Sequence, residues 1–237
     1  MNWTDIENKV DAVEGWLNLH EGRLLYRLAR NCTGRGVIVE VGSWKGKSTI
    51  WMGLGSQAGH NVEIHAVDPH TGSTEHWKSL GRVWTFDEFR ANVKAAGVDD
   101  VVVPHVDFST TAAKKLAEPV EFIFIDGLHE YEAVKADFEA WFPKVVEGGV
   151  IAFHDTTGWS GPRKLVAEAL FKSHQFKQVR FTRSITYGIK VAQNTALDRI
   201  QNRLMLAVFL TYAFAYRHLW KLKRNLTKKP NLTLKPV

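Results

Sequence analysis

The residues best placed to do chemistry are acids that accompany three successive apolar runs in the first half of the chain. Glu40 lies in "VIVEV", Asp68 follows "HAV", and Asp107 follows "PHV". An acid at the end of a first strand suits a cationic group such as an α-ammonium, and an acid at the end of a second strand suits a ribose diol. Asp107 would then lie near an adenine. Together they predict a site for a nucleoside with a positively charged tail and no phosphate.

Glycines surround the first of these acids. The stretch Glu40–Gly46 reads "EVGSWKG", and glycines at a strand end let a ligand approach the backbone closely. A phosphate-binding loop is the alternative, because "GSWKGKST" is close to G-x-x-x-x-G-K-[ST] and "FIFID" (Phe122–Asp126) would serve as its Walker B strand. That loop needs four residues between its glycines, whereas only three separate Gly42 from Gly46. The shortened loop favours the nucleoside interpretation.

A sheet must bring these residues together. Apolar runs rich in Val, Ile and Phe alternate with helical patterns, which predicts a doubly wound α/β sheet of about seven strands, mostly parallel with an antiparallel last strand. The predicted strands are Val37–Val41, Val62–Val67, Val101–His105, Phe122–Ile125, Val150–Phe153, Gln178–Phe181 and Thr186–Val191. The predicted helices between them are Lys47–Ala58, Thr85–Ala96, Thr110–Leu116 and Tyr131–Phe142.

Helical segments are expected on both sides of this α/β domain. We predict an N-terminal helical cap over residues 1–33, the α/β domain over 34–192, and a C-terminal amphipathic helix with a basic tail over 193–237. The single cysteine, Cys32, excludes an internal disulfide, and the N-terminus lacks the pattern of a secretory signal. A cytoplasmic location is therefore expected.

The most specific pattern lies in the second half of the sheet. Residues 122–157 read "FIFIDGLHEYEAVKADFEAWFPKVVEGGVIAFHDTT", with D-G-x-H-x-Y near the start, Gly-Gly before the fifth strand and His-Asp near the end. With E-x-G-x-x-x-G, this resembles class I S-adenosylmethionine-dependent methyltransferases. Within that class it is similar to the small bacterial O-methyltransferases grouped with macrocin-type and cephalosporin-hydroxylase-type enzymes. The resemblance covers about residues 20–191 and implies a Rossmann-like fold with S-adenosylmethionine as cofactor.

The cofactor is expected at the carboxyl ends of the first strands. The residues expected to hold it are Glu40, Gly42, Ser43, Gly46, Ser48, Asp68, Asp107 and Asp126.

Methyl transfer to a hydroxyl requires the enzyme to assist removal of the hydroxyl proton. The sulfonium methyl is already electrophilic, so the enzyme must orient the nucleophile, and a sugar hydroxyl must lose its proton as it attacks. A general base or a divalent cation can assist. The resemblance makes His129 the leading base, with His154 in reserve, and a histidine has a suitable pKa. We therefore expect an O-methyltransferase acting on a hydroxyl of a sugar, glycan or glycosylated natural product.

A metal site is expected beside that base. Asp126 and Asp155 follow the fourth and fifth predicted strands, and two carboxylates in one crevice need a cation or a proton between them. Hard oxygen ligands suit Mg²⁺, the ion we expect first. Related metal-dependent enzymes carry an acidic pair after the fifth strand, whereas this chain has His154-Asp155. His154 is the expected third ligand, and it makes Mn²⁺ the alternative.

Two loops near the strand ends are rich in aromatic and polar residues, namely His70–Trp84 and Gly158–Lys164. Loops of this kind often line acceptor sites. The expected contacts to a small-molecule or glycan acceptor are His70, Trp77, Trp159 and Arg163. Such residues are compatible with sugar rings and equally with a phenol.

The C-terminal segment combines an uncharged apolar stretch with a basic tail. Leu204–Tyr216 contains thirteen residues without a charge, which is too short to span a bilayer, since a spanning helix needs about twenty. Lys221–Lys235 carries six basic residues and no acid, which is typical of a basic tail rather than a nucleic-acid-binding domain. No nucleic-acid partner is expected.

Two interpretations of this segment stay open. It forms either a helix packed on the domain or on a second subunit of a homo-oligomer, or an interfacial helix over residues 204–224 at the inner face of the membrane. A catalytically inactive, membrane-associated scaffold of the same fold is a further alternative. The intact Asp126, His129 and Asp155 argue against it.

Overall fold

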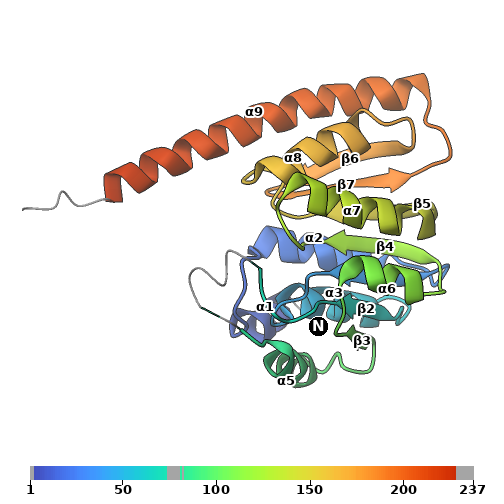
Figure 1. Ribbon diagram of the computed structural model, residues 1–237, viewed down its shortest axis with the longest axis vertical. Coiled ribbons are helices and arrows are strands. Elements are labelled where there is room, and N and C mark those ends of the chain that lie inside the picture. The colour runs from blue at the N-terminus through green and yellow to red at the C-terminus, as the bar shows by residue number, and fades with distance from the viewer. Residues whose placement is uncertain (1–2, 74–80, 82, 228–237) are drawn as a thin grey trace, which may run out of the picture.

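The computed structural model describes residues 3–73, 81 and 83–227, with side chains as far as residue 219 (Figure 1). Seven strands form one sheet in the order β3-β2-β1-β4-β5-β7-β6. The strands are β1 (Val37–Val41), β2 (Ile64–Val67), β3 (Val102–His105), β4 (Val120–Ile125), β5 (Val145–Phe153), β6 (Phe176–Thr182) and β7 (Ile185–Lys190). β7 runs antiparallel to both of its neighbours, and the other pairs are parallel. This confirms the predicted doubly wound sheet with an antiparallel last strand.

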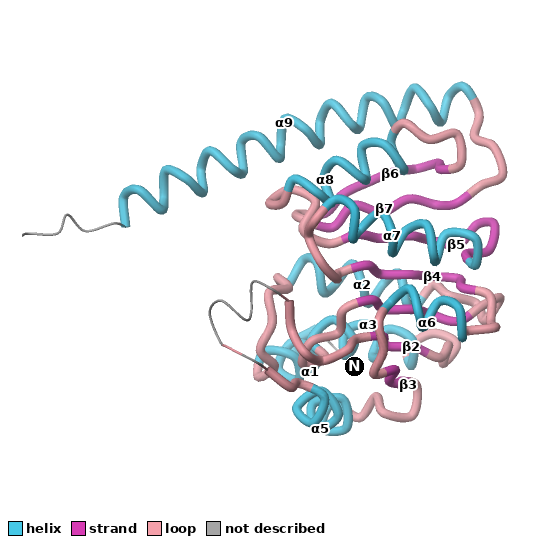
Figure 2. The backbone as a smooth tube through the Cα atoms, in the orientation of Figure 1, coloured by secondary structure: helices cyan, strands magenta, loops and turns pink. Residues whose placement is uncertain are grey.

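Helices cover both faces of the sheet, as Figure 2 shows. They are α1 (Trp3–Asp11), α2 (Leu19–Arg30), α3 (Lys47–Gln57), α5 (Phe86–Ala96), α6 (Ser109–Lys115), α7 (Tyr131–Trp141), α8 (Ser160–Val166) and α9 (Ala196–Thr227). A 3₁₀ turn (Phe142–Lys144) follows α7 and a π-helical turn (Ala167–Phe171) follows α8.

Alternation along the strands divides the core into two layers. In β1, Ile38 belongs to the apolar cluster shared with α1, α2, α3 and α5, whereas Val39 belongs to the cluster shared with α6, α7, α8 and α9. Successive side chains of a strand point to opposite faces, so a strand buried on both faces is mostly apolar. The run Val120–Ile125 is buried at every position for this reason.

Strand register determines where the functional residues meet. Val41 pairs with Val67 and with Ile125, and Ile125 pairs with Phe153. The strands β1, β2, β4 and β5 therefore end level with one another. The residues that follow them lie along one edge of the sheet, here called the catalytic edge and defined by Gly42, Asp68, Asp126 and His154.

Most element boundaries differ from the sequence predictions by one or two residues, and two differences are larger. β5 begins at Val145, five residues before the predicted start, because Gly148 and Gly149 lie inside the strand rather than before it. The helical stretch Ser160–Phe171 was not predicted, although Leu165, Val166 and Leu170 bury an apolar face at helical spacing. The C-terminal helical pattern is confirmed as α9.

Candidate active site

The glycine turn between β1 and α3 is shaped by close contact with β4. Gly42 has a φ of 85°, and a Cβ there would lie 2.2 Å from the backbone oxygen of Asp126. Gly46 has a φ of 91° at the start of α3. Both positions require the left-handed conformation that glycine adopts without strain. The two glycines of the motif are therefore explained by backbone geometry.

Asp68 binds this turn through backbone amides. Its Oδ2 accepts hydrogen bonds from the N–H of Ser43 at 2.9 Å and of Trp44 at 2.8 Å, and its Oδ1 accepts one from the N–H of His70 at 2.7 Å. In a phosphate-binding loop, successive N–H groups of this kind point at the anion. Here a carboxylate takes them, which disfavours phosphate at this turn.

Glu40 lies below the turn, between β1 and α3. Its side chain is fully buried, and the Thr49 hydroxyl of α3 donates a hydrogen bond to it. Burial raises the pKa of Glu40 to about 8, against the hydrogen bonds from Ser48 and Thr49, so the carboxyl is mainly neutral at pH 7. Ser48 is buried in the first turn of α3. A cationic ligand group nearby would favour the ionised carboxylate.

Asp107 lies after β3, at the far end of the expected nucleoside site. Its carboxylate accepts hydrogen bonds from the N–H of Phe108 at 2.9 Å and from Nζ of Lys115 at 2.5 Å. Phe108 itself is 68 % exposed. Asp107 therefore contacts both the residue before α6 and the last residue of that helix.

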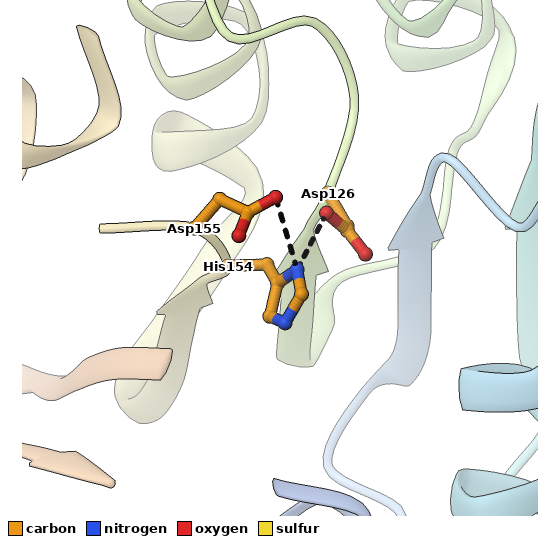
Figure 3. Close-up of side chains that lie close together, drawn as sticks. All are labelled: Asp126, His154 and Asp155. Carbon is orange, nitrogen blue, oxygen red and sulfur yellow. Dashed lines mark hydrogen bonds and ion pairs between the residues drawn. The ribbon is translucent and has the colours of Figure 1, made fainter. Parts of the chain in front are cut away.

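Three side chains meet where β4 and β5 end (Figure 3). Nδ1 of His154 lies 3.0 Å from Oδ1 of Asp126 and 3.6 Å from Oδ2 of Asp155. One ligand atom from each of the three lies within 4.8 Å of the others. Two carboxylate oxygens and an imidazole nitrogen form a donor set that suits a divalent ion such as Mn²⁺. The residues expected to hold a metal are therefore brought together.

A fourth group, missed in the sequence, faces the other side of His154. Oε2 of Glu21 lies 3.6 Å from Nε2 of His154, and both side chains are buried. Ser184, before β7, donates to Glu21 Oε1 through its N–H at 2.8 Å and its hydroxyl at 2.6 Å. Glu21 also accepts from the N–H of Asn18 in the capping box of α2. The carboxylate is thus held in place toward His154.

His154 is surrounded by negative charge. Burial alone would lower its pKa, but the carboxylates of Asp126, Asp155 and Glu21 outweigh that effect and raise the pKa well above 6.5. Both of its nitrogens face carboxylates, Nδ1 toward Asp126 and Asp155 and Nε2 toward Glu21. Because His154 is buried among these carboxylates, it is less available than His129 to act as the base.

His129 lies across Asp155 from His154. Its Nε2 is 3.0 Å from Asp155 Oδ2, and its ring stacks on Trp159 with centroids 4.5 Å apart. Asp155 has a φ of 56°, a left-handed conformation in which Asp is favoured over most residues. Burial would raise the pKa of Asp155, but hydrogen bonds and charge from both histidines lower it well below 3.8. Asp155 is therefore a carboxylate shared by two imidazoles.

The expected acceptor residues are placed differently from one another. Trp159 is 42 % exposed at the catalytic edge, and Arg163 in α8 donates to the backbone oxygen of Thr157 at 3.0 Å. His70 is fully buried, and its Nδ1 lies 3.0 Å from the Thr85 hydroxyl. His70 therefore ties the two ends of its loop together. Trp77 lies outside the described residues.

Comparison with known proteins gives the family. A family model described as a methyltransferase domain matches residues 39–156, which include the glycine turn and the Asp126, His154 and Asp155 group. Among curated proteins, a 37-residue segment is 51 % identical to the uncharacterized protein y4gI of Sinorhizobium fredii. That segment is 16 % of this chain and spans only 4 % of that protein's length.

Solved structures of the same fold include three O-methyltransferases. NovP has a TM-score of 0.63 at 18 % identity, covering 73 % of this chain and 81 % of its own. TomG from Streptomyces achromogenes, bound to S-adenosylmethionine, has a TM-score of 0.56 at 15 % identity, and the match covers 80 % of this chain and 88 % of TomG. The O-methyltransferase from Bacillus cereus, bound to S-adenosylhomocysteine, has a TM-score of 0.55 at 18 % identity, and the match covers 79 % of this chain and 90 % of that enzyme. Residues 39–156 therefore form a methyltransferase domain, and the chain has the fold of these S-adenosylmethionine-dependent O-methyltransferases.

Proposed function

We propose that this protein transfers the methyl group of S-adenosylmethionine to a hydroxyl oxygen of a sugar, glycan or glycosylated natural product. The observation that carries the proposal is the His129–Asp155 pair at 3.0 Å, beside the carboxyl end of β5 and level with the glycine turn. A base held by a carboxylate is what a hydroxyl nucleophile requires, whereas a thiol or an amine needs little help.

The cofactor would lie along the ends of β1, β2 and β3. Glu40 would face its ammonium group, Asp68 would hold the turn and face the ribose, and Asp107 would lie near the adenine. In support, Asp68 and Asp107 follow strands that end level with β1, Glu40 lies one residue before the end of β1, and the amides of Ser43 and Trp44 are bound by a carboxylate. Two solved O-methyltransferases of the same fold carry this cofactor or its product, which supports the choice of cofactor.

The chain's own residues would then move one proton. The acceptor oxygen forms a bond to the methyl carbon as the bond from carbon to sulfur breaks, which leaves S-adenosylhomocysteine. His129 takes the hydroxyl proton, and Asp155 stabilises the imidazolium that forms. Stacking on Trp159 fixes the plane of the His129 ring. This arrangement orients the base before the acceptor binds.

Asp126, Asp155 and His154 would hold a divalent ion, with Mn²⁺ favoured by the imidazole and Mg²⁺ by the carboxylates. When bound, such an ion acidifies a hydroxyl and orients it. Glu21 is placed to orient His154 in such a site, because a histidine that binds a metal usually donates its other N–H to a carboxylate.

A sugar acceptor is favoured by the exposed surface at this edge. Trp159 offers an exposed aromatic ring next to His129, and Arg163 of α8 is half-buried and donates to the backbone oxygen of Thr157. Aromatic faces pack against the C–H faces of sugar rings, and a guanidinium donates hydrogen bonds to hydroxyls. The same residues would also permit a phenolic acceptor, so the test includes both glycosides and catechols.

The test is methyl transfer from labelled S-adenosylmethionine to a panel of glycosides, free sugars, catechols and thiols, with EDTA, Mg²⁺ or Mn²⁺ present. We expect labelled glycosides, loss of turnover in EDTA and recovery with metal. Labelling of thiols alone would contradict the proposal of a hydroxyl acceptor. Full turnover in EDTA would contradict the metal while leaving methyl transfer intact.

A further inference from the structure

The helix α9 carries an apolar face that packs on nothing in the described part of the chain. Its buried residues, Asn202, Leu206, Phe209 and Ala213, face β6 and the turn after α8. The opposite side of the helix is exposed and apolar. This outer stripe consists of Leu197, Ile200, Leu204, Val208 and Leu219, which are between 55 % and 66 % exposed. Their spacing of three and four residues, or multiples of it, places them on one side of the helix.

The helix also extends beyond the domain that supports it. Its 32 residues span about 48 Å, and after Ala213 no residue of α9 whose side chain is described is buried. Figure 1 shows α9 continuing past the sheet on the side toward which β4 points, which is the side of the catalytic edge. Arg217 lies near Arg163 of α8, since its charge adds to burial in lowering the pKa of Arg163. The free half of α9 therefore begins beside the catalytic edge.

Charge decides what covers the outer stripe. Along α9, Asp198 is the single acid, whereas six residues are basic, namely Arg199, Arg203, Arg217, Lys221, Lys223 and Arg224. Three more lysines and no acid follow the helix. A second copy packed along the same stripe would bring these cations together, and like charges repel. An anionic occupant gains from them instead.

We propose that α9 lies on the surface of an anionic lipid bilayer, with the outer stripe in the headgroup region and the basic residues against lipid phosphates. An amphipathic helix with an apolar face and basic flanks binds in this way, and its affinity combines buried apolar area with attraction to anionic lipid. Within the described residues no helix is long and apolar enough to cross a membrane, so the helix would lie in the surface. The catalytic edge would then face lipid-carried acceptors, a consequence that rests on the proposed function.

The test is cosedimentation of the full chain with two kinds of vesicle, phosphatidylcholine alone and phosphatidylcholine with about one third phosphatidylglycerol. We expect binding to the mixed vesicles, at least about tenfold weaker binding to the neutral ones, and weakening by salt. The variant Leu204→Glu/Val208→Glu should lose binding to the mixed vesicles by at least about tenfold. It should still bind S-adenosylhomocysteine, which shows that it is folded.

The matched control is Asn8→Glu/Ala12→Glu, which adds the same charge at the same spacing on exposed residues near the N-terminus. It should bind mixed vesicles within about twofold of the unaltered chain. An equal loss of vesicle binding in both double variants would mean that added negative charge alone weakens binding, and it would overturn the proposal. So would absence of binding to mixed vesicles, or a dimer in light scattering that Leu204→Glu/Val208→Glu dissociates while vesicles bind nothing. Cofactor binding in the unaltered chain tests the proposed function separately.

Discussion

Replacing Glu40 by glutamine should stabilise the cofactor-free protein and weaken its cofactor binding. Glu40 is fully buried, and burial raises its pKa from 4.5 to about 8. Between those two values the unfolded chain has released a proton that the folded chain retains. Stability therefore falls as the pH rises through this range, by about 1.4 kcal/mol per pH unit.

The accumulated cost in the unaltered protein is about 3 kcal/mol at pH 7 and about 5 kcal/mol above pH 8. Glutamine has the same shape, accepts the hydrogen bond from Thr49 and does not ionise. At pH 5 the free energies of unfolding of Glu40→Gln and of the unaltered protein should therefore be similar. As the pH rises to 8.5, the variant should become increasingly more stable than the unaltered protein. Cofactor affinity should fall by at least about tenfold, because a neutral amide cannot pair with an ammonium group.

The assay is urea denaturation of both proteins at pH 5, 7 and 8.5, without ligand, followed by titration with S-adenosylhomocysteine. Glu118→Gln, which removes an exposed acid, serves as the control. A stability difference that is the same at all three pH values would refute the reasoning. A variant less stable than the unaltered protein at pH 8.5 would refute it as well.

Three further changes test other parts of the site. His129→Gln should lower turnover by about 10²–10⁴-fold while S-adenosylhomocysteine affinity stays within about twofold, with exposed His174→Gln as the control; full turnover would remove His129 as the base. Glu21→Gln should weaken Mn²⁺ binding in calorimetry by about tenfold or more, because the His154 imidazole loses its charged partner; unchanged affinity would contradict that positioning role. Gly42→Ala should lower the free energy of unfolding by about 2–3 kcal/mol in urea, because a Cβ would meet the Asp126 backbone oxygen; a change below about 0.5 kcal/mol would contradict the close approach.

The fold was predictable because its signals are local. Each central strand is a short, mostly apolar run, and β4, Val120–Ile125, is buried throughout. The start of β5 and the helix α8 were not predicted from the sequence. Gly148 and Gly149 indicate a turn in the sequence, yet the structure accommodates them within the strand, Gly148 with a φ of 79°.

The site was predictable where residues follow strands directly. Asp126 and His154 follow β4 and β5, and parallel strands of equal register bring their ends together. Glu21 was not predictable, because it comes from α2 and is linked to Ser184 across 163 positions of sequence. Its local pattern, Asn18-x-x-Glu21, indicates only a helix cap.

His70 shows the limit of reading a loop by composition. Its position in a polar and aromatic loop predicts contact with an acceptor, but its ring is buried against Phe86 and Phe89. A polar atom in a buried ring needs a partner, and Thr85 supplies one. Burial of this kind depends on the packing of α5, which the loop sequence does not encode.

The central claim is that the glycine turn holds an amino-acid-bearing nucleoside. The most direct measurement is calorimetric titration of the metal-loaded protein with S-adenosylhomocysteine and, in parallel, with ATP and Mg²⁺. We expect saturable binding of S-adenosylhomocysteine alone, since Asp68 occupies the amides that a phosphate would need. Binding of ATP without binding of S-adenosylhomocysteine would contradict it and assign the turn to phosphate chemistry.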